Sequence, residues 1–100
     1  MSLEKKVLEI TRGIPRGRVL TYKEITKKLG NENLARAIGN ALNKNPYSGV
    51  PCHRVIRFDG SVGGYAGGVR KKIALLKKDG VIVVSGKVDL KRFGYVLKKK

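Results

Sequence analysis

The chain contains one cysteine and one histidine, so covalent or metal cross-links cannot hold its fold together. A disulfide needs two cysteines, and a structural zinc site needs four Cys or His ligands. Stability must therefore come from burial of apolar side chains. With 100 residues, of which 41% are hydrophobic, we expect a single domain over residues 1–100 with one modest core and no metal site.

The charge balance is strongly basic, with 23 Lys and Arg against 7 Asp and Glu and a formal net charge of +16. Such a field attracts phosphate-bearing ligands, which makes nucleic acid the first candidate partner. The alternative is a charged, solvated surface without a polyanionic partner. The sequence has no apolar run long enough for a membrane span and no signal-peptide pattern at its start, so we expect a soluble, cytoplasmic protein without a membrane partner.

Apolar residues recur at helical spacing in three segments of the first half of the chain. The first segment covers residues 3–12 and follows Ser2 as N-cap. The second opens on the capping box Thr21–Glu24 and closes at Gly30, and the third runs from Leu34 to about Asn45. Two short helices joined by a glycine-containing turn have the outline of a helix-turn-helix, although the same hairpin also occurs for packing alone.

The second half of the chain predicts loops, one helix and a hairpin. Glycine, proline and serine are frequent from Tyr47 to Gly68, where Asp59-Gly60 predicts a turn. Val69, Ile73 and Leu76 then predict a helix that ends at Asp79-Gly80. Residues 81–84 and 87–90 predict a β-hairpin around Ser85-Gly86. The expected fold class is mainly α with short strands: a winged-helix-like helix-turn-helix DNA-binding domain with a C-terminal β-hairpin.

The cysteine and the histidine are adjacent, at Cys52 and His53. A cysteine attacks as its thiolate, which a nearby cation or imidazole favours. Pro51 predicts an extended backbone, in which neighbouring side chains point to opposite faces. We therefore expect proton transfer from Cys52 to His53 through a water or a bend rather than by direct contact. The alternative interpretation is a buried structural cysteine.

The glycine-rich segment at residues 63–68 does not fit a phosphate-binding loop, because Val69-Arg70 follows where a Walker A motif needs Lys and Ser or Thr. Tyr65 could instead cover the face of a flat ligand that backbone amides approach closely. The alternative is a turn whose tyrosine packs on the core.

Pro51-Cys52-His53-Arg54-Val55 resembles the active-site signature of the O6-alkylguanine-DNA alkyltransferases. Further segments resemble this family in the same order, between about Ile14 and Gly80. They are the entry to the helix-turn-helix, the recognition helix, the asparagine loop, the lid and the last helix, at residues 17–22, 35–41, 45–46, 64–68 and 72–80. Two features differ from the family pattern: only the short segment at residues 3–10 precedes the matching residues where members commonly carry an N-terminal domain, and Asp79 stands where a glutamate is usual.

The resemblance implies a protein that extrudes O6-alkylguanine from double-stranded DNA and transfers the alkyl group irreversibly to its own cysteine. Thymine O4 is a second candidate position. It implies a monomer that needs no cofactor and reacts once. The implied catalytic residues are Cys52 as acceptor, His53 as water-mediated base, Asp79 as its carboxylate partner and Asn45 as support of the active-site turn.

The resemblance also implies a set of residues that contact DNA or the extruded base. Tyr22 would promote extrusion, and Arg36 would fill the vacated place in the stack. Small residues would let the recognition helix approach the minor groove, and the pocket residues would hold the base. The small residues are Ala35, Ala37 and Gly39. The pocket residues are Val55, Tyr65 and Ala66.

Two other functions remain open at this stage. One is a helix-turn-helix DNA-binding module with a structural cysteine. The other is a lesion-recognition protein without catalysis, as in the alkyltransferase-like proteins, which keep the pocket but replace the cysteine. The presence of Cys52 argues against the second.

Overall fold

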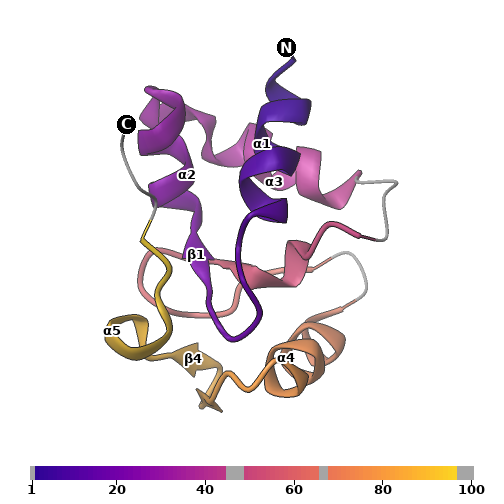
Figure 1. The fold of residues 1–100 in the computed structure, drawn as a ribbon, viewed down its shortest axis with the longest axis vertical. Helices are drawn as coiled ribbons and strands as arrows, with labels where there is room; N and C mark the ends of the chain where they lie inside the picture. Colours follow the sequence, from indigo (N-terminus) through magenta and orange to yellow (C-terminus); the bar gives the residue numbers. More distant parts are fainter. Residues whose placement is uncertain (1, 45–48, 66–67, 97–100) are drawn as a thin grey trace.

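A computed structural model describes residues 2–44, 49–65 and 68–96 (Figure 1). Along these residues the elements are α1 (Leu3–Arg12), β1 (Leu20–Thr21), α2 (Tyr22–Leu29), η1 (Glu32–Leu34), α3 (Ala35–Asn43), η2 (Cys52–Arg54), β2 (Val55–Ile56), α4 (Val69–Lys78), β3 (Val83–Val84), β4 (Lys87–Val88) and α5 (Leu90–Phe93). The predicted fold class, mainly helical with short strands, is confirmed.

The helix-turn-helix forms as its capping residues predict. The Thr21 side chain accepts a hydrogen bond of 3.1 Å from the Glu24 N–H, which starts α2. Gly30 ends α2 in the left-handed region at φ 81°, a conformation that a residue with a Cβ rarely adopts. Asn31 then caps the short turn η1 through its bond from the Asn33 N–H, at 2.9 Å, and α3 follows directly. The chain thus enters α3 through a tightly defined turn.

A short parallel pair, β1 with β2, lies at the centre of the molecule and divides its core in two (Figure 1). Successive strand residues face opposite sides. Leu20 and Val55, which are partners in the register, face the three N-terminal helices, whereas Val19 and Ile56 face α4, the hairpin and α5. The single core expected from the sequence is therefore two clusters, one on each side of the strand pair.

The first cluster is built on the apolar faces of α1, α2 and α3. Its buried members are Val7, Leu8, Ile14, Leu20, Ile25, Ile38, Ala41, Leu42, Val50 and Val55. The second joins α4 to the C-terminal hairpin and α5, and its members are Val19, Ile56, Val62, Leu76, Val81, Val88 and Phe93. Cys52 packs on the first cluster next to the strand pair.

The C-terminal hairpin forms as predicted, with β3 antiparallel to β4. Helix α4 also forms, but its inner face differs from the expected one. Val69 is 46% exposed, and Lys72 is buried beside Leu76. Within the described parts of the chain, no helix is long and apolar enough to cross a membrane.

Candidate functional site

The Cys52–Arg54 segment is a 3₁₀ turn rather than the extended stretch that Pro51 predicted. The Cys52 N–H bonds to Val50 O at 2.9 Å, and the Arg54 N–H bonds to Pro51 O at 3.0 Å. These two bonds pull the backbone into a turn before β2 begins. The half-buried Cys52 lies against α3, with its Sγ 3.7 Å from Leu42 O.

His53 contacts Asp79 directly, with 2.7 Å between Nε2 and Oδ2. Asp79 is the C-cap of α4, so the end of that helix brings the shorter carboxylate within reach without an intervening water. Burial lowers the pKa of His53, the bond to Asp79 offsets this only in part, and Arg54 and Lys72 lower it further. A neutral ring must donate from Nε2 to the carboxylate, so Nδ1 is the acceptor nitrogen.

Arg54 holds the same carboxylate from a second side. Its Nε lies 2.7 Å from Asp79 Oδ2 and its Nη2 3.1 Å from Oδ1, while Nη1 donates to Ile14 O at 2.9 Å. Burial alone raises the pKa of Asp79, but the hydrogen bonds from Arg54 and His53 outweigh burial and lower it. Asp79 is thus a fixed anion. The sequence analysis named Arg54 only as part of the motif around Cys52 and missed this role.

Lys72 is a buried lysine in the site, only 1% exposed, and the sequence analysis did not single it out. Its Nζ donates to Val55 O at 2.8 Å and to Gly64 O at 3.2 Å. Burial lowers its pKa to about 8, and the charge of Cys52 acts in the opposite direction. Lys72 therefore ties the backbone after the cysteine to the glycine-rich segment and places a cation near the sulfur.

The charge of Cys52 affects the pKa of two nearby tyrosines. Burial raises the pKa of Tyr22, the charge of Cys52 raises it further, and Arg57 acts in the opposite direction. Burial and Cys52 also raise the pKa of Tyr65. Both phenols stay protonated at neutral pH and can donate a hydrogen bond. Tyr65 lines a pocket of about 380 Å³ together with His53 and Arg54.

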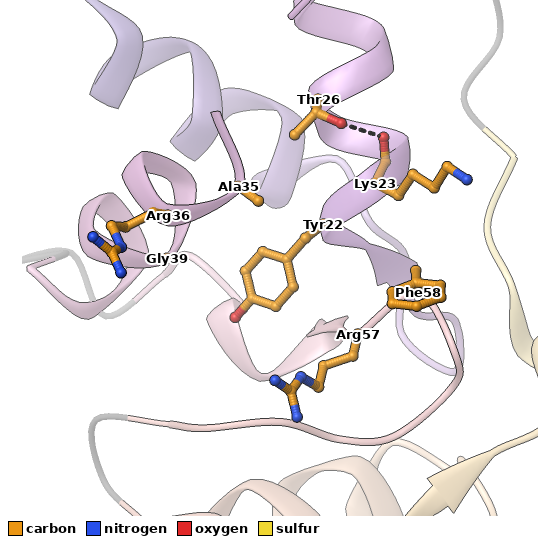
Figure 2. Close-up of a pocket in the computed structure, with 8 residues that line it drawn as sticks. All are labelled: Tyr22, Lys23, Thr26, Ala35, Arg36, Gly39, Arg57 and Phe58. Carbon is orange, nitrogen blue, oxygen red and sulfur yellow. Dashed lines mark hydrogen bonds between the residues drawn. The ribbon is translucent and has the colours of Figure 1, made fainter. Parts of the chain in front are cut away.

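Four of the residues expected to meet DNA or the extruded base line a larger pocket of about 590 Å³ between α2 and α3 (Figure 2). They are Tyr22, Ala35, Arg36 and Gly39, and the other lining residues are Lys23, Thr26, Arg57 and Phe58. Ala37 lies half-buried on α3, outside that lining, and Val55 is buried, with its carbonyl bonded to Lys72. Asn45 and Ala66 lie outside the described residues.

The structure thus brings Cys52, His53, Asp79, Tyr22 and Tyr65 to one region next to the helix-turn-helix. Among the described residues, no cluster of three or more His, Cys, Asp or Glu side chains could hold a metal ion. The contacts of Lys72 and Arg54 could not be predicted from the sequence, because other basic residues lie near both of them along the chain. No local signal distinguishes them from solvated neighbours.

The fold and the site define a small, mainly helical DNA-binding domain of the alkyltransferase type. A family model described as 6-O-methylguanine DNA methyltransferase, DNA binding domain, matches residues 2–81, and the chain belongs to this family.

Curated relatives are similar over most of this chain. The methylated-DNA–protein-cysteine methyltransferase of Methanothermobacter thermautotrophicus is 47% identical over 79 residues, which cover 78% of this chain and 44% of that relative. The protein of the same name from Salmonella typhimurium is 43% identical over 82 residues, or 81% of this chain and 48% of the relative. The chain therefore spans about half the length of these curated relatives.

Solved structures share the fold. Schizosaccharomyces pombe Atl1, solved in complex with damaged DNA containing O6-carboxymethylguanine, matches with a TM-score of 0.84 and 28% identity, over 97% of this chain and 100% of its own. Mycobacterium tuberculosis OGT, solved in complex with DNA, matches with a TM-score of 0.74 and 38% identity, over 80% of this chain and 49% of its own.

Proposed function

We propose that this chain repairs alkylated DNA by transferring the alkyl group from guanine O6 to Cys52, once per molecule. One observation carries the proposal: the Cys52–His53 pair lies beside the helix-turn-helix, with His53 held by Asp79 at 2.7 Å. The names of the curated relatives agree with this chemistry. The domain formed by residues 1–100 would carry both the DNA-binding surface and the alkyl acceptor, and would act as a monomer.

The alkylated base must first leave the duplex, because its O6 is stacked among neighbouring bases. Tyr22 and Arg36 line the pocket between α2 and α3 and would act at this step. Tyr22 would crowd the phosphate of the target nucleotide, and Arg36 would occupy the vacated position in the stack. The small residues Ala35, Ala37 and Gly39 would let α3 approach the minor groove closely.

The transfer is then a single displacement. His53 accepts the thiol proton of Cys52 through a water at Nδ1, and Asp79 holds the ring in the required orientation. The sulfur forms a bond to the alkyl carbon as the bond from that carbon to O6 breaks, and the electron pair stays on the guanine. The guanine regains one proton, which balances the proton lost by Cys52. The thioether product is stable, so the protein is consumed, and no cofactor takes part.

The extruded base would lie between Tyr65, the amides near Ala66 and the backbone of Val55. Donors aimed at O6 stabilise the negative charge that develops there. Val55 O already accepts from Lys72, so a contact with the base edge would use its second lone pair. Asn45 would support the turn that carries the cysteine.

The test is incubation with duplex DNA that carries a labelled methyl group on guanine O6. The label should move to the protein up to one equivalent, and the mass of the peptide that contains Cys52 should rise by one methylene. Cys52→Ala should accept no label and still bind the DNA, because phosphate contacts do not depend on the sulfur. Label transfer to the Cys52→Ala variant would refute the assignment, since the chain has no other thiol.

A lesion-binding protein without transfer is the second candidate. The similarity to Atl1 over almost the whole of both chains favours it, whereas Cys52 favours transfer. In the same experiment, tight binding to the modified duplex with all of the label retained on the DNA would support the second candidate and exclude the first.

A further inference from the structure

The turn after β2 presents a large aromatic side chain to solvent. Phe58 is 69% exposed and is a member of neither apolar cluster, although it follows the buried strand residue Ile56 by only two positions. The sequence analysis predicted only a turn at Asp59-Gly60 here. Phe58 and its neighbour Arg57 nevertheless line the pocket between α2 and α3, so this turn forms part of the same surface as the helix-turn-helix.

The turn is fixed before any ligand arrives. Asp59 Oδ1 accepts from the Ser61 N–H at 3.0 Å and from the Ser61 hydroxyl at 2.7 Å. The Arg57 N–H bonds to Ser61 O, and Gly60 O accepts from the Val88 N–H at 2.8 Å, which anchors the turn to β4. Gly60 has φ 90°, and a Cβ there would lie 2.7 Å from Val88 O. Arg57 and Phe58 are therefore held on a rigid support.

The pocket has the charge of an anion site. Its lining includes the three cationic side chains Lys23, Arg36 and Arg57, and none of the described side chains that line it is acidic. The stem of Arg57 packs on the glycine-rich segment, since a Cβ on Gly63 would lie 3.0 Å from Arg57 Cγ. Figure 2 shows the polar ends of Tyr22 and Arg57 on the same side of the pocket, and the Arg57 charge acts on Tyr22.

We propose that Arg57 and Phe58 form one side of the DNA-binding surface of the protein, opposite α3. Arg57 binds a backbone phosphate of the strand that carries the extruded nucleotide, and Phe58 packs on the adjacent deoxyribose. A guanidinium binds phosphate with two parallel hydrogen bonds, and an exposed aromatic ring covers an apolar sugar face. This inference rests on the proposed function, because the strand that Arg57 would bind is the one whose extruded nucleotide reaches Cys52.

The first experiment compares Arg57→Ala with the wild type on two substrates. Single-turnover transfer from duplex DNA with O6-methylguanine should slow by about tenfold or more, because a charge-assisted contact is lost. Transfer from free O6-benzylguanine, which has no phosphate, should stay within about twofold. The slope of log K against log salt for duplex binding should fall by about 0.9, the value for one phosphate contact.

Two matched variants sharpen the comparison. Arg57→Lys keeps the charge and should keep the salt slope. Lys6→Ala removes one exposed charge from α1, outside this pocket, and should change neither the slope nor the rate. An unchanged slope and rate in Arg57→Ala, or an equal loss on both substrates, would overturn the phosphate contact.

Failure of the proposed function gives a different result. A wild-type protein that accepts no alkyl group from either substrate would refute the transfer reaction. The salt slopes of wild type and Arg57→Ala on unmodified duplex would still test the phosphate contact.

For Phe58→Ala we expect a loss of about threefold or more in duplex affinity at an unchanged salt slope, because the lost contact carries no charge. Unchanged affinity would contradict the sugar contact.

Discussion

At the scale of single residues, the site depends on one carboxylate that serves two donors. Asp79 accepts from His53 and, through both of its oxygens, from Arg54. Arg54 in turn donates to Ile14 O in the segment after α1. The carboxylate therefore orients the imidazole and also joins α4 to the N-terminal half, so its catalytic and structural contributions have to be separated by experiment.

For Asp79→Asn we expect slower transfer and a shift of the pH profile of Cys52 alkylation by iodoacetamide towards higher pH. A neutral amide holds the His53 ring less firmly and does not stabilise its cation. Asp79→Glu, which restores the residue usual in the family, is the control and should keep the profile of the wild type. Coincident profiles for Asp79→Asn and the wild type would show that His53 works without a carboxylate partner.

Lys72 gives a second prediction, about stability rather than chemistry. Its pKa in the folded protein is about 8, below the ordinary 10.5, so between these pH values the unfolded chain binds more protons. The contribution of Lys72 to the free energy of unfolding must then rise with pH in this window. Urea unfolding should show the difference between wild type and Lys72→Met growing by about 2 kcal/mol from pH 8 to pH 10.

The matched control is Lys71→Met, which removes the exposed neighbour on the same helix. Its difference from the wild type should be flat over the same pH range. A flat difference for Lys72→Met as well would mean that the buried ammonium keeps its ordinary proton affinity despite its burial.

At the scale of elements, the N-caps of α1 and α2 should both contribute to stability, but only the N-cap of α2 should also affect function. Thr21 caps α2 immediately before Tyr22, whereas Ser2 caps α1 far along the chain from the site. Thr21→Ala and Ser2→Ala should each lower the free energy of unfolding by about 1 kcal/mol. Only Thr21→Ala should also slow transfer from duplex DNA, because it loosens the turn that positions Tyr22. Equal transfer rates in the two variants, measured well below their melting temperatures, would contradict a positioning role for this cap.

The helices could be predicted from the sequence because their signals are local. Capping residues and apolar spacing are contained in each segment, as at Thr21 and Gly30. The parallel pairing of β1 with β2 could not be predicted in this way, because it joins two-residue strands 35 positions apart in the register, Leu20 with Val55. Helix α5 was also missed, since four residues are too few to show a period.

The candidate site also has features that could be predicted from the sequence and features that could not. The pairing of His53 with Asp79 followed from the family resemblance, and the structure confirms the contact, while the catalytic roles stay predictions. The extended backbone expected at Cys52 was wrong, because two backbone hydrogen bonds, from the Cys52 N–H to Val50 O and from the Arg54 N–H to Pro51 O, close a turn there. The burial of Lys72 depends on two carbonyls supplied by distant segments, which no local pattern reveals.

At the scale of the whole molecule, the net charge of +16 is large for a body of 100 residues. It favours encounter with any polyanion, while the pocket between α2 and α3 and the turn at Cys52 provide the specific contacts. Affinity and chemistry should therefore be separable. The first belongs to the cationic side chains that contact phosphate, and the second to the residues around Cys52, His53 and Asp79.

The last prediction follows from that separation. The logarithm of the duplex binding constant should fall linearly with the logarithm of the salt concentration, with a slope of about 0.9 per phosphate contact. Wild type and Cys52→Ala should share one slope, because the sulfur contacts no phosphate. Undamaged duplexes of different sequence should bind within a narrow range of affinity, since phosphate contacts carry no sequence information. Fluorescence anisotropy over a salt series measures both, and a salt-insensitive affinity or a strongly preferred undamaged sequence would favour a regulatory DNA-binding module instead.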